Sequence, residues 1–295
     1  MVLMKNAGKR RYWSAAAALI LCVALAVVTA GCVQKVTAVS IAKQTADNLE
    51  KVKSLTAKEN LKMGMKLASG DNSMDLSIDM DMDMKLVKEP LTGSVDMKAK
   101  LEGMGTSTEV GALTYLEKDG ENVVTYTSVE GGEYTKQVTP AGDFKGVELT
   151  DMSVLRKIAD VSQTAELRKE TEDVNGTEAY VIDLTLSGET LQEMLDGSMS
   201  GLQGAGLDVK VTDLKDCEVP TVLYISKEKK LPVRITMDLT SLGDKLTGQI
   251  SETIGTAGLE LSVTEMTSIM DFMDYDAFDS IEIPEEARAA KEVEL

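Results

Sequence analysis

The chain has 295 residues, of which 49 are acidic, 31 are Lys or Arg and none is His, so its net charge at neutral pH is −18. A negative charge of this size repels nucleic acid and anionic lipid headgroups, which argues against binding to either through a charged surface. The absence of histidine excludes Ser-His-Asp triads and the zinc sites that contain histidine.

The first 31 residues have the three parts of a secretory signal peptide. A basic start is followed by a mostly apolar stretch over residues 14–28 and then by small residues. The apolar stretch has about 14 residues, too few for the ~20 that a membrane-spanning helix needs. The basic residues are Lys5, Lys9, Arg10 and Arg11. We therefore expect residues 1–31 to be removed from the mature protein.

This segment ends in Thr29-Ala30-Gly31-Cys32, which resembles the lipobox of bacterial lipoproteins. In that family the signal is cut just before the cysteine and the cysteine sulfur is diacylated; Leu is usual where this chain has Thr29. The alternatives are a signal cut after Ala30 or an uncleaved anchor. The resemblance implies a lipid on Cys32, a short tether over residues 32–39, and attachment to the extracytoplasmic face of the cell membrane, where two or more acyl chains hold a protein durably.

Apolar residues at helical spacing then predict an amphipathic helix over Ser40–Leu55. After it the period changes to two, which is typical of antiparallel strands with one apolar and one wet face. Three such runs cover Leu61–Leu67, Met74–Leu86 and Val95–Leu101, with turn residues between them. The middle run of 13 residues exceeds the usual strand length, and strands that long must twist, so the sheet should be strongly curved.

The rest of the chain is predicted to add strands and a few short helices. The strands are expected over Ala112–Leu116, Asn122–Thr127, Glu133–Val138, Ala165–Thr171, Glu178–Leu186, Val209–Thr212, Thr221–Ser226, Leu231–Leu239, Leu259–Met266 and Tyr275–Pro284. The helices are expected over Asp151–Val161, Glu189–Leu195 and Glu285–Ala290, whereas residues 241–258 fit neither type. No linker divides the chain, so residues 40–295 should form a single α+β domain: a strongly curved antiparallel sheet, open as a half-barrel, with a few helices on its concave face.

Three stretches resemble a known group of proteins. They are Asp47–Leu67, where a helix leads into a strand, Leu223–Leu239, where a basic turn leads into a Leu-Pro step, and Ser280–Glu286 near the end. The group is that of the LolA-like and LppX-like half-barrels, which sort lipoproteins or carry lipids. The resemblance implies a curved sheet wrapped around helices, with an apolar cavity that receives acyl chains. The soluble carrier of the group has no lipid, so a chain with Cys32 is closer to the anchored branch.

Eight methionines lie between Met63 and Met104, at the apolar phase of the predicted strands or beside it. Methionine is flexible and polarizable, which suits a surface that accepts varied apolar shapes. We predict a hydrophobic groove for an acyl chain; the alternative is an ordinary core in which Met replaces Leu. The predicted lining residues are Met63, Met65, Met74, Leu76, Ile78, Met80, Met82, Met84 and Met97.

Two further features are considered as possible sites. Four acids line one side of the second run: Asp75, Asp79, Asp81 and Asp83. Calcium takes several carboxylates, but side chains two residues apart on a strand lie about 7 Å apart, so we expect a solvated face and no metal. Cys217 has no disulfide partner once Cys22 is removed and Cys32 is lipidated, and we expect it to be buried and inert.

No P-loop or GxSxG motif occurs, so neither an enzyme nor a cofactor is expected. The first hypothesis is a monomeric binding protein, held at the membrane through Cys32, whose partner is a lipid or lipoprotein ligand and not a nucleic acid. The second is a structural or interaction lipoprotein whose interior is filled by its own side chains. A hydrolase without histidine is the third.

Overall fold

The computed structural model describes residues 36–69, 72–103, 105–142, 165–192, 214–254 and 260–293. Residues 38–295 form one compact unit, distinct from residues 1–37. The predicted signal peptide, Cys32, the helix over Asp151–Val161 and the strand over Val209–Thr212 lie outside the described residues. The predicted division into residues 1–31, 32–39 and 40–295 stays a prediction.

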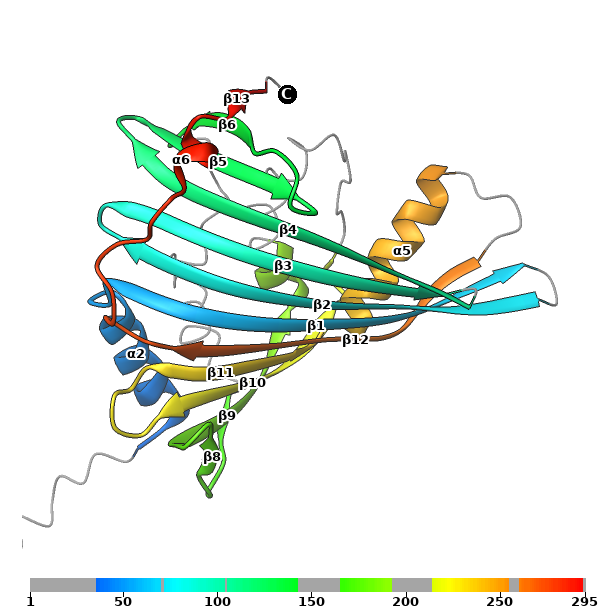
Figure 1. Cartoon of the computed structure of the whole chain (residues 1–295). Coiled ribbons are helices and arrows are strands. Elements are labelled where there is room, and N and C mark those ends of the chain that lie inside the picture. The colour runs from blue at the N-terminus through cyan, green and yellow to red at the C-terminus, as the bar shows by residue number, and fades with distance from the viewer. Residues whose placement is uncertain are drawn as a thin grey trace, which may run out of the picture. The chain divides into compact units, whose positions relative to one another are not determined.

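The described strands form a single sheet, which Figure 1 shows as a curved layer. They are β1 Ser54–Ser69, β2 Asn72–Lys88, β3 Leu91–Gly103, β4 Thr106–Asp119, β5 Asn122–Val129, β6 Thr135–Pro140, β7 Glu166–Leu167, β8 Glu172–Val174, β9 Thr177–Ser187, β10 Glu218–Ser226, β11 Pro232–Asp238, β12 Glu260–Met273 and β13 Lys291–Glu292. Their order is β13-β6-β5-β4-β3-β2-β1-β12-β11-β10-β9-β7, with β8 beside β9. Apart from β13 and β6, neighbours are antiparallel. The path has two ends, so the predicted open antiparallel sheet is confirmed.

Alternation along β2 sets the two faces of the sheet. Its aspartates are exposed, while its apolar positions are half-buried or buried. The register then places Met80 of β2 between Leu61 of β1 and Ala99 of β3, so these side chains share a face. We call this the inner face, because the helices α2 (Ala38–Leu49) and α5 (Thr240–Ile254) pack on it, and we call the other the outer face.

Helix α2 confirms the first predicted helix, and helix α5 lies where the sequence left the type of structure open. The first helix ends at Leu49, earlier than predicted, and the Lys88 ammonium donates a hydrogen bond of 2.7 Å to the carbonyl of Leu49 at that end. Helix α5 occupies most of the stretch whose type the sequence left open. Residues 188–192 are helical, in agreement with the predicted start of a helix there. None of the helices in the described ranges is long and apolar enough to cross a membrane.

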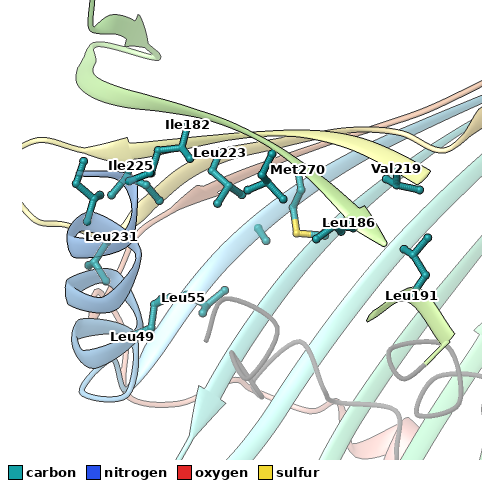
Figure 2. Close-up of a cluster of buried hydrophobic side chains, with 14 of the residues drawn as sticks. Leu49, Leu55, Ile182, Leu186, Leu191, Val219, Leu223, Ile225, Leu231 and Met270 are labelled. Atoms are coloured by element: carbon teal, nitrogen blue, oxygen red, sulfur yellow. The ribbon is translucent and has the colours of Figure 1, made fainter. Parts of the chain in front are cut away.

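The main core lies between these helices and the inner face, and Figure 2 shows the part of it beside α2. It joins α2, α5, β1, β2, β9, β10 and β12 through buried aliphatic side chains. Leu49 and Leu231 lie at one end of the cluster, and Val219 and Leu191 lie at the other. These side chains are sealed from water, and truncating one of them would cost about 2–5 kcal/mol of stability.

The predicted strand over Tyr275–Pro284 is wrong, because residues 274–284 form no strand. Asp274 and Asp276 have φ of 51° and 57°, a left-handed conformation that breaks an extended run. Only Ile283 of this stretch becomes fully buried, and it does so on the outer face with Val124, Tyr126 and Ala287. The short helix α6 (Glu285–Arg288) follows as predicted, but it packs on the outer face rather than on the concave one.

The close approach of two segments at Gly188 gives a first prediction. A Cβ at this position would lie 1.6 Å from the carbonyl oxygen of Leu214, so the backbone would have to move. We expect Gly188→Ala to lower the free energy of unfolding in urea by about 1–3 kcal/mol. Gly248→Ala in α5 is the control, since its Cβ would meet nothing within 4 Å, and it should raise stability by up to about 1 kcal/mol. Equal stability of the two variants would contradict the described packing.

Candidate functional site

The inner face of β1, β2 and β3 holds all nine residues that were predicted to line a groove. Met63 and Met65 on β1 face Ile78 and Leu76 on β2, and Met82 on β2 faces Met97 on β3. The other three predicted residues, Met74, Met80 and Met84, occupy the same phase of β2. We call these nine residues the methionine surface. Their role as a ligand lining stays a prediction.

The methionine surface has a sealed end and a half-open part. Met84 is only 7% exposed and belongs to the main core with Leu55 and Leu86. The eight other members are half-buried. Along β2 the inner face therefore changes from packed core to apolar surface between Met84 and Met82.

Three exposed apolar side chains continue the methionine surface across the sheet. Leu101 is 48%, Val110 40% and Val129 54% exposed. Leu101 of β3 faces Ile78, Val110 of β4 lies beside Ala99, and Val129 of β5 lies beside Ala112, so all three project from the inner face. Three of the seven large apolar side chains that are exposed in the described ranges thus lie together here. Exposed apolar groups that gather in one place mark a binding surface more often than scattered ones do.

The sequence did not identify these three residues as part of the site. Leu101 lies within a predicted strand, but the lining of the groove was predicted from the strands' methionines and their nearest apolar neighbours. Val110 preceded the predicted start of its strand at Ala112, because Gly111 interrupts the apolar pattern. The length of β4, Thr106–Asp119, is what brings Val110 onto the inner face.

Within the described ranges, the sealed end leaves little empty space. A cavity of about 50 Å³ lies among Leu55, Met84, Leu86, Leu116 and Phe272. Ligand pockets are typically about 300–1,000 Å³, so this cavity does not accommodate an acyl chain. The half-open part of the inner face is therefore the part that a ligand could contact.

One carboxylate projects from the inner face of β1. Glu59 is half-buried between Met82 of β2 and Met270 of β12. The Ser268 hydroxyl donates a hydrogen bond of 2.7 Å to Glu59 Oε1. Burial raises the pKa of Glu59 above its ordinary value, and the Ser268 hydrogen bond offsets part of the rise.

The four aspartates of β2 lie on the outer face among basic and amide side chains. Lys58 Nζ is 2.9 Å from Asp83 Oδ1, and the Asn60 amide donates to Asp79 at 2.8 Å and to Asp81 at 2.9 Å. These contacts join Asp79, Asp81 and Asp83 to side chains of the neighbouring strand β1, as expected for a solvated face. Within the described ranges, no group of three or more His, Cys, Asp or Glu is placed to hold a metal ion. Cys217 is buried as predicted, at 1% exposure.

A family model covers most of the chain, from residue 37 to residue 292. The chain belongs to the Family of unknown function (DUF6612). This membership covers nearly all the described elements, from α2 to β13. No curated protein matches the chain in sequence.

Solved structures provide similar folds at low sequence identity. LprF from Mycobacterium bovis is 13% identical, with a TM-score of 0.44, over 84% of this chain and 96% of that one. The lipoprotein LppX from Mycobacterium tuberculosis is 11% identical, with a TM-score of 0.37, over 83% and 97%. A LolA superfamily protein from Nitrosomonas europaea is 11% identical, with a TM-score of 0.20, over 85% and 96%. These are the groups that the sequence resembles, and at TM-scores below 0.5 the similarity does not extend to a site or a ligand.

The raised pKa of Glu59 predicts how stability depends on pH. The folded protein binds this proton more tightly than the unfolded chain, so the favourable contribution is fully present below the ordinary pKa of 4.5 and is lost as the pH rises through the folded-state pKa. Glu59→Gln keeps the size and the hydrogen-bond acceptor but cannot ionise. We expect its urea midpoint to exceed that of the wild type at pH 8, and the difference to shrink toward pH 4.

Glu109→Gln is the matched control, because Glu109 is exposed on the outer face of β4. Its effect on the midpoint should be small at both pH values. A Glu59→Gln difference that stays constant with pH, or grows at pH 4, would contradict the described environment of the carboxyl group.

Proposed function

We propose that this protein is a non-enzymatic lipoprotein, attached to the extracytoplasmic face of the membrane through lipid on Cys32, that binds an acyl-chain or other apolar ligand on its inner face. The observation that carries the proposal is the exposed apolar group of Leu101, Val110 and Val129, continuous with the half-buried methionine surface. A chain lying there removes apolar area from water on both partners, and each buried CH₂ contributes about 0.8 kcal/mol.

Methionine suits such a surface because its side chain adapts its shape. Its thioether rotates freely and is polarizable, so one set of residues can contact chains of different length or branching. The surface lies on three adjacent strands of a continuous ladder, which holds its backbone while the side chains adapt. A rigid backbone with flexible side chains favours a class of ligands rather than one compound.

A structural or interaction lipoprotein is the second candidate, and two observations favour it. The interior near α2 is filled by the protein's own side chains. A groove of about 1160 Å³ lies on the outer face, between β3, β4 and the C-terminal residues 286–293. In this alternative a partner protein or an envelope polymer would bind the outer face, and the inner face would bind nothing.

The anchor is tested by Cys32→Ser in the full chain. The variant lacks the sulfur that carries the lipid, so we expect loss of palmitate incorporation and release of the protein from the membrane fraction. Cys217→Ala is the control and should keep both properties, since that thiol is buried in the fold. Palmitate incorporation into the Cys32→Ser protein would exclude this cysteine as the attachment site.

The ligand surface is tested by native mass spectrometry of residues 33–295, produced without lipid. We expect co-purifying lipid masses and binding of a fluorescent fatty acid. The double variant Met80→Asp, Met82→Asp should abolish both, because a charged group at these positions would have to lose its hydration beneath an apolar chain. The control Ile269→Asp places the same charge on an exposed apolar site of the outer face and should leave binding unchanged. A clean mass and no fatty-acid binding in the wild type would favour the second candidate.

A further inference from the structure

Glu59 departs from the pattern of its own strand. From Leu55 to Leu67, every second residue of β1 projects from the inner face, and all of these except Glu59 are apolar. A carboxylate at an inner position costs solvation energy unless a partner compensates it. Its presence among apolar neighbours therefore needs a physical reason.

The position of Glu59 is where the two parts of the inner face meet. On one side lie Ala57 and Met84, which belong to the sealed core. On the other side lie Leu61 and Met80, which are half-buried. The carboxylate thus lies at the end of the apolar surface that borders the sealed core. An acyl chain lying along that surface would terminate there.

The described partners of Glu59 leave it with spare hydrogen-bonding capacity. An ionised carboxylate offers about four acceptor positions, and the Ser268 hydroxyl uses one of them. Ser268 is fully buried, so its hydrogen bond to Glu59 Oε1 lies on the protein side of the carboxylate. Among the residues that the structure describes, Glu59 makes no ion pair. Glu59 as a whole residue is only half-buried, so part of it remains open on the side of the apolar surface.

We propose that Glu59 is a head-group site, which takes the amine or hydroxyl head of a long-chain amphiphile whose chain lies along the methionine surface. The inference rests on the proposed function, because it names the ligand class of the same surface. A protonated amine head forms a hydrogen bond and an ion pair with the carboxylate, whereas a hydroxyl head donates a hydrogen bond to it but brings no charge of its own. A carboxylate or phosphate head meets a like charge instead and is disfavoured.

The dimensions agree with a ligand of this class. The strand from Glu59 to Leu67 is about 26 Å long at ~3.3 Å per residue. One leaflet of a bilayer core is about 15 Å thick, which is the depth that a membrane acyl chain spans. A single acyl chain with its head at Glu59 therefore stays within the length of the surface.

The test uses the full chain in phosphatidylcholine vesicles and three photoactivatable amphiphiles of equal chain length. They carry an amine, an alcohol and a carboxylate head, and labelling of the β1–β3 peptides is measured by mass spectrometry. For each head the yield in Glu59→Gln is divided by the yield in the wild type, which cancels differences in partitioning into the vesicles. Glu109→Gln, which removes the same charge from the outer face, is the matched control.

We expect the amine ratio to fall about 10-fold, since the ion pair with the carboxylate is lost. The alcohol ratio should fall less, because the Gln carbonyl still accepts its hydrogen bond, and the carboxylate ratio should rise. Equal ratios for the three heads would overturn the head-group site and leave the proposed ligand surface in place. The same change in Glu109→Gln would also overturn it, because net charge would then be the cause. Absence of labelling by all three heads in the wild type would overturn the proposed function as well.

Discussion

Pairing between β1 and β12 joins the two halves of the sheet. Strands β1 to β6 follow one another as a meander, and β9 to β12 form a second antiparallel group. The ladder from Thr56 opposite Met273 to Ala68 opposite Glu260 connects them. The loop after β12 reinforces it, because the Asp276 carboxylate accepts a hydrogen bond of 2.6 Å from the Lys53 amide. Without this ladder neither α2 nor α5 would have a continuous apolar face to pack on.

The joined sheet has an inner face whose character changes along the strands. Where α2 and β9 approach β1, the side chains of Leu49, Leu55 and Ile182 exclude water and form the core. Farther along β1 and β2, the same alternation continues with residues that are only half-buried. The core stabilises the fold, while the half-buried continuation remains available for binding. Glu59 lies where the packed core ends and the half-buried apolar surface begins. It is a polar residue among apolar neighbours and could orient a ligand.

The alternating pattern predicted much of this arrangement, because a strand with a period of two places its apolar residues on one face whatever its partner is. The run Met74–Leu86 therefore indicated the strand and the common face of its methionines. The partner of β1 could not be predicted, since pairing between distant strands leaves no local signal. A strand was predicted over Tyr275–Pro284, but the left-handed residues Asp274 and Asp276 and the burial of Ile283 on the outer face produced a different path. Glu59 was not identified from the sequence, because the predicted strand began at Leu61, and its burial and its contact with Ser268 depend on the pairing with β12.

Binding of a ligand to the inner face can be measured through the accessibility of the methionine sulfurs. Peroxide oxidises exposed methionine to the sulfoxide, and mass spectrometry gives the rate at each residue. In protein stripped of lipid, we expect faster oxidation of Met80 and Met82 than of Met84, and protection of the first two when a long-chain amphiphile is added. Equally slow oxidation at all three residues, or rates that do not change when the amphiphile is added, would contradict a ligand surface on the inner face.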